Sequence, residues 1–344
     1  MIINRRSALS LGTVATAGAV LGASATVAAS ASAEPATDAA PDAAQAASRV
    51  ARVYARETER AQGVWSSYLT VTGADGAQQV AVEAGADTVV EAYSVNKLAV
   101  ATAVLDKIDR GLLTLDQRVE VSADIVIQDT DGIFALDRAY PSSITLGHAM
   151  ANLLTVSDNT AVRLCGLVCP ALELNEILRG KGFVHTQVVP VSNPNRFFLG
   201  QTTPRETHTL LSRLVAGELL SPTSTDYLLN TIRSMAAFTD GMRLNLTTPQ
   251  RLRVATKAGW FESGRNEAGV VFAADGHASA VYSLFAAGPF TGDAAVNDAD
   301  FGAPHPALRA RQALGKVLFD AVEGLPTAGV RAQRTPRYRP SNGG

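Results

Sequence analysis

The sequence predicts an α+β fold, in which one antiparallel sheet is built from both chain ends and a helical subdomain is inserted between its two halves. Predicted strands gather at 64–93 and again at 251–287, and the stretch between them shows mostly the apolar periodicity of helices. One helical segment precedes the first strands and another follows the last. Two groups of strands that flank a block of helices are typical of α+β proteins.

The first predicted elements form one half of the sheet. A helix that begins at 48 is followed by strands at 64–72, 79–84 and 88–93, which are separated by turns containing glycine and aspartate. Helical periodicity then dominates the chain to about residue 220. The helices predicted there cover 95–110, about 145–155, 158–167, 170–180 and 204–217, the last beginning with the capping box Thr203-Pro204-Arg205-Glu206.

The last predicted elements complete the sheet. Helices are expected at about 223–235 and 238–244, followed by strands at 251–257, 267–273 and 278–287 and by a closing amphipathic helix at 306–323. Asp275-Gly276 is predicted to form the hairpin turn between the last two strands. The sequence therefore predicts one domain over 48–325, with a sheet subdomain (48–93 and about 225–325), a helical subdomain (94–224) and a flexible tail (326–344).

The first 33 residues are predicted to be an export signal. Arg5 and Arg6 precede an apolar stretch rich in alanine and glycine, and Ala31-Ser32-Ala33 has the small-x-small pattern of a cleavage site. A permanent membrane anchor is less favoured, because the stretch is weakly hydrophobic and no charged stop follows it. We expect a twin-arginine signal peptide at 1–33, a disordered leader at 34–47 and a secreted mature protein.

The composition limits the classes of function. The 344 residues include 30 basic and 32 acidic side chains, a net charge of −2, without a basic cluster that would bind nucleic acid. No zinc-like spacing of Cys and His and no glycine-rich phosphate loop occur, so neither a metal nor another cofactor is expected. Cys165 and Cys169 are four residues apart, and two buried thiols are favoured over a local disulfide, which a straight helix accommodates poorly.

The stretch Tyr93-Ser94-Val95-Asn96-Lys97 is the first that indicates chemistry. It lies where a predicted strand ends and an apolar helix begins, so the hydroxyl of Ser94 and the amine of Lys97 can share one helix face. A lysine in an apolar wall can act as the base that activates a serine. By itself, this pair also fits a capping serine followed by a solvated lysine.

Two further motifs follow in order, Ser157-Asp158-Asn159 and Lys257-Ala258-Gly259. The three motifs together resemble the active-site elements of the penicillin-recognising serine hydrolases, and the Ser-Asp-Asn element points to the class A β-lactamase-like branch. The resemblance extends over nearly all of 48–325 and includes the segments 153–161, 202–206 and 266–272. It implies a β-lactamase/transpeptidase-like fold.

The resemblance also implies how the reaction would proceed. Ser94 would attack an amide or ester carbonyl to form an acyl-enzyme, and Lys97 would accept its proton. Ser157 would relay a proton to the leaving nitrogen, helped by the positive charge of Lys257.

The same resemblance assigns the substrate contacts. The backbone N–H groups of Ser94 and Trp260 would form the oxyanion hole. Asn159, Ala258 and Gly259 would bind the substrate, and Asn159 would also steady the catalytic lysine. Asp158 is expected to cap a helix instead of taking part in the chemistry.

One departure from the family pattern concerns deacylation. In class A β-lactamases, a glutamate in the loop after the Ser-Asp-Asn helices activates the deacylating water. Here no Asp or Glu occurs from Ile177 to Arg205, and Asn193-Pro194 stands where the glutamate and its proline are expected. Asn193 could position a water molecule but not accept its proton, and His185 could accept it only if the fold places it there.

A second departure is Ala258, where the family usually has a hydroxyl residue that helps bind a substrate carboxylate. Losing such a hydrogen bond removes about 1.5–3 kcal/mol of binding. Arg251 or Arg253 could compensate, although ordinary polar strand positions are favoured for both. Glu267 could face the site as a substitute acid, although a surface carboxylate is the favoured interpretation.

These features predict a secreted, monomeric serine hydrolase that acts on a β-lactam, in antibiotic resistance or β-lactam catabolism. A D-alanyl peptidase, esterase or acyltransferase is the alternative, and a lactam-binding protein that deacylates very slowly is a third possibility. Rapid lactam turnover would favour the first, turnover of peptides or esters the second, and a stable adduct the third. Neither nucleic acid nor stable membrane insertion after signal cleavage is expected.

Overall fold

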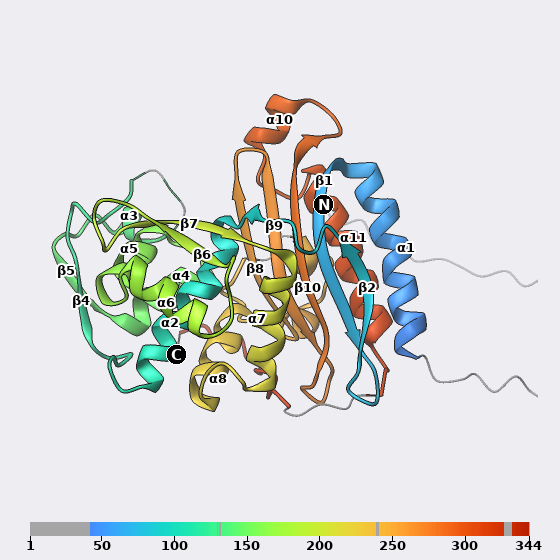
Figure 1. The fold of residues 1–344 in the computed structure, drawn as a ribbon, viewed down its shortest axis with the longest axis horizontal. Coiled ribbons are helices and arrows are strands. Elements are labelled where there is room, and N and C mark those ends of the chain that lie inside the picture. Colours follow the sequence, from blue (N-terminus) through green and yellow to red (C-terminus); the bar gives the residue numbers. More distant parts are fainter. Residues whose placement is uncertain (1–41, 129, 131, 239–240, 327–331, 344) are drawn as a thin grey trace, which may run out of the picture. The chain divides into compact units, whose positions relative to one another are not determined.

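The computed structural model describes residues 42–128, 130, 132–238, 241–326 and 332–343. It confirms the predicted α+β class and the assembly of the sheet from both chain ends (Figure 1). The main sheet has five antiparallel strands in the order β2-β1-β10-β9-β8. They are β1 (Gln62–Thr72), β2 (Gln78–Ala84), β8 (Val254–Phe261), β9 (Gly264–Phe272) and β10 (Ala278–Phe290).

The two halves of the sheet meet where β1 pairs with β10, with Tyr68 opposite Ser283. Short turns join neighbouring strands within each half. The turn between β9 and β10 contains the predicted Asp275-Gly276 pair, and Gly276 adopts a φ of 92°, which favours glycine. At one edge of the sheet, β8 lies against the segment that carries Ser94.

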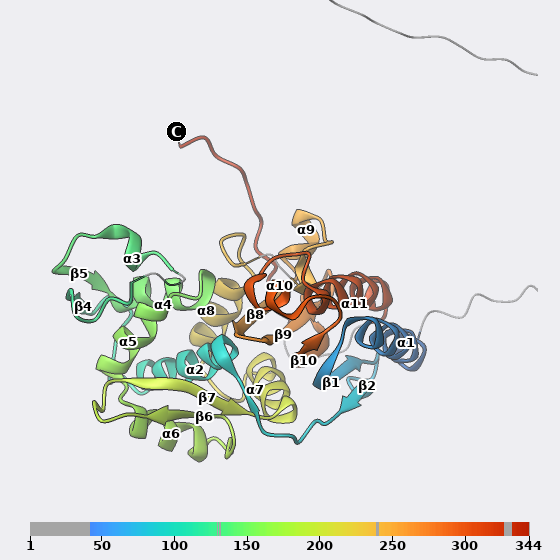
Figure 2. The ribbon, with the colours of Figure 1, turned by 90° about the horizontal axis from the view of Figure 1, so that it is seen from above.

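Helices cover both faces of this sheet (Figures 1 and 2). On one face, α1 (Ala43–Ala61) and α11 (Pro306–Val322) lie side by side, and their apolar side chains form a core with those of β1, β2 and β10. On the other face, α7 (Pro204–Ala216) packs on β1 and β10, and α8 (Pro222–Ile232) packs on β8. Because both faces are covered, every residue of β9 is buried.

The helix α2 (Lys97–Asp109) lies at the centre of the helical region. Its residues 97–105 are all buried, so it is enclosed on all sides instead of being amphipathic. It contacts α4 (Leu146–Thr155), α5 (Asn159–Val168) and α6 (Ala171–Gly180). Side-chain oxygens that accept an N–H of the first turn fix the starts of α4, α5, α7 and α8; these belong to Thr145, Asp158, Thr203 and Ser221.

The remaining elements are short. They are β3 (Val90–Glu91), η1 (Tyr93–Asn96), β4 (Arg118–Val121), α3 (Phe134–Asp137), β5 (Ser142–Thr145), β6 (Gln187–Pro190), β7 (Phe197–Thr202), η2 (Gly241–Arg243), α9 (Thr248–Arg251) and α10 (Ala294–Ala299). Strand β4 pairs with β5, and β7 pairs with both β3 and β6. The sequence did not predict β4, β5, β6 and β7, since strands of four to six residues show too few alternations to be recognised.

Several boundaries differ from the prediction, and three of these differences have a clear local cause. Helix α1 begins at Ala43 and not at 48, because the Asp42 carboxylate caps its first turn, so the end of the predicted leader is helical. The predicted strand at 88–93 is reduced to β3, since the chain turns into η1 at Tyr93. Strand β8 begins only at Val254, because the residues before it form α9.

The chain ends are described in part. The predicted signal at 1–33 lies outside the described residues, as does most of the predicted leader. Residues 332–343 form neither helix nor strand, but Gln333 is buried and its N–H donates to the Gly276 carbonyl at 2.7 Å. Part of the predicted flexible tail is therefore packed against the domain. Within the described ranges, no helix combines the length and the apolar character needed to cross a bilayer.

The two cysteines are reduced and fully buried, as the sequence analysis favoured. Burial raises the pKa of Cys165 and of Cys169 to about 12, so both thiols stay protonated at neutral pH.

Candidate active site

Ser94 lies in η1, the turn that leads directly into α2. Tyr93 begins this turn with a φ of 48°, a left-handed conformation that redirects the chain from β3 into the helix. Ser94 is half-buried, and Lys97 follows one turn later as the first residue of α2. The predicted nucleophile and base are thus on adjacent turns at the start of a buried helix.

Lys97 is completely buried, and oxygen atoms surround its side-chain nitrogen. Its Nζ donates to Ser157 Oγ at 2.9 Å and to Asn159 Oδ1 at 2.8 Å, and it also donates to the Ser157 carbonyl. A buried lysine needs such partners, since an isolated buried charge is costly. The connection between α4 and α5 therefore supplies the partners of the predicted base.

Ser157 is the residue on which the two lysines of the sequence motifs converge. Its Oγ accepts hydrogen bonds from Lys97 Nζ and from Lys257 Nζ, each at 2.9 Å. Lys257 is buried on β8 and donates in addition to the Ala258 carbonyl at 2.6 Å. Ser157 has a φ of 58°, unusual for a residue with a side chain, in the short connection between α4 and α5. A hydroxyl between two lysines can accept a proton from one side and donate one to the other.

The strand β8 brings its backbone against the nucleophile. A Cβ atom at Gly259 would lie 2.7 Å from the Ser94 nitrogen and 2.8 Å from the Val95 nitrogen, so only glycine fits there. Trp260 follows on the same strand. The backbone amides of Ser94 and Trp260, predicted to form the oxyanion hole, therefore come from two segments that are in direct contact.

Asp158 has the structural role that the sequence predicts. Its Oδ1 accepts the N–H of Ala161 and caps α5, while its Oδ2 accepts the N–H groups of Ile133 at 2.6 Å and of Phe134 at 3.0 Å. A Cβ atom at Gly132 would lie 2.1 Å from Oδ2, so this loop also needs a glycine. One carboxylate thus joins α5 to the loop at 132–134.

Asn159 connects the catalytic network to its surroundings. Its Oδ1 accepts from Lys97, and its Nδ2 donates to Thr130 Oγ1 at 2.7 Å. The steadying of Lys97 by Asn159 is therefore present in the structure, and its proposed contact with substrate stays a prediction.

Two acidic residues outside the motifs, Glu267 and Glu173, lie away from the site. Glu267 is completely buried, so its interpretation as a surface carboxylate is wrong. It accepts the N–H of Met242 and the hydroxyl of Thr256, and its Oε2 lies 3.5 Å from Arg311 Nε on α11. It thus belongs to the core behind β8. Glu173 pairs with Lys107 at 2.7 Å.

The basic residues considered as carboxylate binders are also structural. Arg251 donates to the carbonyls of Arg243 and Leu244, and Arg253 pairs with Glu323, the residue that follows α11. Neither compensates for the missing hydroxyl at Ala258, which has no side-chain donor of its own.

The loop that replaces the family's glutamate loop is a β6–β7 hairpin. Asn193 lies in its exposed part, where its Oδ1 accepts the N–H of Asn195, and the Pro194 carbonyl accepts the N–H of Ala171 at the start of α6. His185 is exposed, and its N–H donates to Glu206. Neither Asn193 nor His185 lines the cavity described next.

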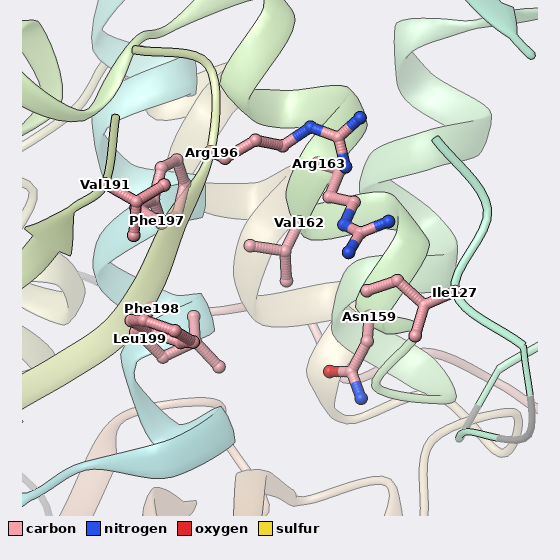
Figure 3. Close-up of a pocket in the computed structure, with 9 residues that line it drawn as sticks. All are labelled: Ile127, Asn159, Val162, Arg163, Val191, Arg196, Phe197, Phe198 and Leu199. Carbon is pink, nitrogen blue, oxygen red and sulfur yellow. The ribbon is translucent and has the colours of Figure 1, made fainter. Parts of the chain in front are cut away.

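A cavity of about 330 Å³ lies between this hairpin and α5 (Figure 3). Asn159 forms part of its wall, so the cavity adjoins the catalytic network. The other lining residues are Ile127, Val162, Arg163, Val191, Arg196, Phe197, Phe198 and Leu199. Sequence reasoning missed Arg163 and Arg196. The spacing of Arg163, four residues after Asn159 on one helix, is a signal that could have found the first of them.

An aromatic cluster lies against β8 and shares no residue with the lining of this cavity. The Trp260 ring lies between those of Phe238 and Phe301, with centroid distances of 5.4 and 6.3 Å. Phe238 is 37% exposed and Phe301 is 42% exposed. Because side chains alternate between the two faces of a strand, Trp260 lies on the same face as Ala258. Apolar surface therefore surrounds Ala258, where the family usually has a hydroxyl residue.

The model of the Beta-lactamase enzyme family matches residues 45–322, which is most of the chain. The chain belongs to the β-lactamase enzyme family. It is therefore a serine hydrolase of β-lactamase type, and the predicted resemblance is confirmed. Among curated proteins, none matches the sequence significantly.

Solved structures of this family share the fold. A β-lactamase from Xanthomonas campestris is 21% identical with a TM-score of 0.64, over 80% of this chain and 98% of the other. A β-lactamase from Sphaerobacter thermophilus is 16% identical with a TM-score of 0.63, over 80% and 97%. A mutant of PBP-A, in an acyl-enzyme complex with penicillin G, is 21% identical with a TM-score of 0.61, over 80% and 95%.

Proposed function

We propose that this β-lactamase family member is a secreted hydrolase that opens β-lactam amides through a Ser94 acyl-enzyme and deacylates slowly. The observation that carries the proposal is the convergence of Lys97 and Lys257 on Ser157 Oγ, each at 2.9 Å, at the start of the Ser94 helix. The acyl-enzyme complex of a PBP-A mutant with penicillin G supports the same chemistry on this fold.

Acylation would use this hydrogen-bond network for its proton transfers. Lys97, in its neutral form, accepts the proton of the Ser94 hydroxyl while Ser94 Oγ bonds to the carbonyl carbon. The resulting oxyanion accepts hydrogen bonds from the amides of Ser94 and Trp260. When the C–N bond breaks, the Ser157 hydroxyl gives its proton to the leaving nitrogen and Lys97 returns a proton to Ser157. Lys97 thus ends the step neutral, and Lys257 stabilises the negative charge that develops near Ser157.

Deacylation requires a base for water, and the described part of the site offers no carboxylate for it. Glu173 pairs with Lys107, Glu267 lies in the core behind β8, and Glu206 accepts N–H groups of residues 184–186. General base catalysis contributes typically 10²–10⁴-fold to such a step. We therefore expect the acyl-enzyme to accumulate.

A second function, hydrolysis of an ester or peptide, is favoured by the surroundings of Ala258. The side of β8 that would receive the leaving group presents Ala258 and the cluster of Phe238, Trp260 and Phe301. These side chains offer apolar contacts and no donor for a carboxylate beyond the Trp260 indole N–H. An uncharged, apolar leaving group suits this surface better than a carboxylate does.

Export is also part of the proposal. The Arg5-Arg6 pair and the Ala31-Ser32-Ala33 site support removal of a signal peptide. Mass analysis of the protein recovered from the culture medium tests this, since a mature N-terminus near Glu34 is expected. An intact N-terminus on cell-associated protein would contradict it.

The central experiment is intact-mass analysis of the purified protein mixed with a penicillin, from seconds to hours. We expect an adduct that forms rapidly, maps to Ser94 and persists, and we expect none on a Ser94→Ala variant. Rapid return of the free mass with accumulating product would show efficient deacylation. If no adduct and no product appear, the β-lactam substrate is wrong, and a thioester or D-alanyl ester with an apolar leaving group becomes the next substrate.

A further inference from the structure

Two arginines line the cavity beside the catalytic network. Arg163 comes from α5, one turn after Asn159, and Arg196 comes from the chain just before β7. Figure 3 shows their guanidinium groups on the same side of the cavity, although the two side chains start from opposite walls. Two like charges thus point to one region of a half-buried site.

Among the described residues, the Asp124 carboxylate offsets the charge of this pair only in part. Arg163 Nη1 donates to the Ile125 carbonyl at 3.0 Å, and Arg196 Nη2 reaches the Asp124 carbonyl at 3.5 Å. Neither guanidinium forms an ion pair with a carboxylate of the described part. Burial and then the charge of Arg196 lower the pKa of Arg163, and the weaker opposing effect of the Asp124 carboxylate does not cancel them. An anion between the two arginines would remove this repulsion.

The rest of the cavity is apolar. Its walls are Ile127, Val162, Val191, Phe197, Phe198 and Leu199. Asn159 closes the side towards the catalytic site, where it accepts from Lys97 Nζ at 2.8 Å. A side chain that extends from the acyl carbon at Ser94 past Asn159 therefore contacts an aliphatic and aromatic surface first. The two guanidinium groups lie beyond that surface.

We propose that this cavity is an acyl-side subsite for a substrate with an apolar stem that ends in a carboxylate, held by Arg163 and Arg196. The inference rests on the proposed function, since it names the substrate class of the same site. It also gives the site a distinct polarity: the charge of the substrate lies on the acyl side, while the leaving-group side at Ala258 is apolar.

A pair of penicillins with matched side chains tests the subsite. One carries a hexanoyl side chain and the other an adipoyl side chain, which has the same length and ends in a carboxylate. The second-order rate constant for acylation of Ser94 is measured by quenched-flow mass analysis. We expect the adipoyl compound to react roughly 10- to 100-fold faster, the range given by one hydrogen bond to a charged group.

Variants then assign the preference to the arginines. Arg163→Gln and Arg196→Gln should each reduce the adipoyl preference by about 10-fold, and the lysine variants at both positions should restore part of it. Arg179→Gln is the matched control, because Arg179 donates to Gln187 on the same hairpin but does not line the cavity. A purely structural role would slow both compounds equally in the glutamine variants and lower the melting temperature.

Binding to a Ser94→Ala variant separates the subsite from the chemistry. If neither compound acylates the enzyme, yet the adipoyl compound binds this variant more tightly in an arginine-dependent way, the proposed function fails and the subsite stands. If both acylate at equal rates, or the preference survives both glutamine variants, the subsite is overturned and the proposed function stands. If neither acylation nor preferential binding occurs, both are overturned.

Discussion

Replacing Ser157 by glycine or by alanine separates the chemical role of its hydroxyl from the strain of its backbone. Ser157 has a φ of 58°, and its Oγ accepts from two buried lysines. Both variants lack the hydroxyl, but only glycine adopts a left-handed φ without steric cost. The two variants should therefore be equally impaired in catalysis and unequally stable.

The magnitudes follow from the contacts. A residue with a Cβ pays about 1–2 kcal/mol in the left-handed region, so the glycine variant should be more stable than the alanine variant by about that amount. Loss of a hydrogen bond to a charged group costs about 1.5–3 kcal/mol. Lys97 keeps Asn159 Oδ1 and Lys257 keeps the Ala258 carbonyl, which limits this loss in both variants. For a chain of this size, a difference of 1 kcal/mol corresponds to about 2 °C in melting temperature.

Two assays decide the outcome. Thermal unfolding should place the glycine variant about 2–4 °C above the alanine variant, and stopped-flow acylation should be about 10²–10⁴-fold slower than wild type in both. Equal melting temperatures would refute the reasoning from backbone strain. Wild-type acylation in either variant would refute the role of Ser157 as proton relay.

Three further predictions concern residues around the site and in the core. Gly259→Ala should lower both the acylation rate and the melting temperature, because its Cβ would lie 2.7 Å from the Ser94 backbone nitrogen and force β8 and the nucleophile segment apart. An unchanged rate would contradict the close contact of β8 with the nucleophile. Burial lowers the pKa of His208 to about 4, below its unfolded value of about 6.5. The folded state therefore favours neutral His208. About 3 kcal/mol of stability is lost as the pH falls from 6.5 to 4. Denaturant unfolding should show this slope in wild type and a shallower one in His208→Gln, and identical slopes would exclude His208 as its source. Glu267→Gln should destabilise the fold by about 3–5 kcal/mol, since it leaves the buried Arg311 without its counter-charge; Glu262→Gln, at an exposed turn, should have little effect in the same unfolding experiment.

The catalytic motif residues could be predicted because each motif combines reactive residue types at a fixed short spacing. Helix geometry alone predicts that Ser94 and Lys97 lie on one helix face. The prediction that Ser157 and Lys257 act together with Lys97 depended on the family resemblance. The structure supplies these contacts directly. The fold class could be predicted from the order of helical and strand-like segments, which depends only on local periodicity.

What could not be predicted depends on contacts between distant segments. Glu267 looked like a surface residue, since nothing local reveals that Arg311 on the last helix lies against it. The aromatic cluster joins residues 238, 260 and 301, and the cavity joins α5 to the β6–β7 hairpin. Arg196 belongs to a loop that a backbone hydrogen bond from Ala171 to the Pro194 carbonyl ties to α6, and residue types alone do not specify this contact.

The pairing of β1 with β10 determines when the enzyme can become active. Tyr68 and Ser283 are neighbours in the sheet although 215 residues separate them in the chain. Such long-range pairing makes folding slow, and until β10 is present one edge of β1 remains unpaired and prone to associate with other chains. Ser94 precedes the helical region and Lys257 follows it, so the proton path cannot form before both halves of the sheet have joined. Catalytic competence is thus acquired late in folding, and no N-terminal fragment that ends before β8 can hold the complete site.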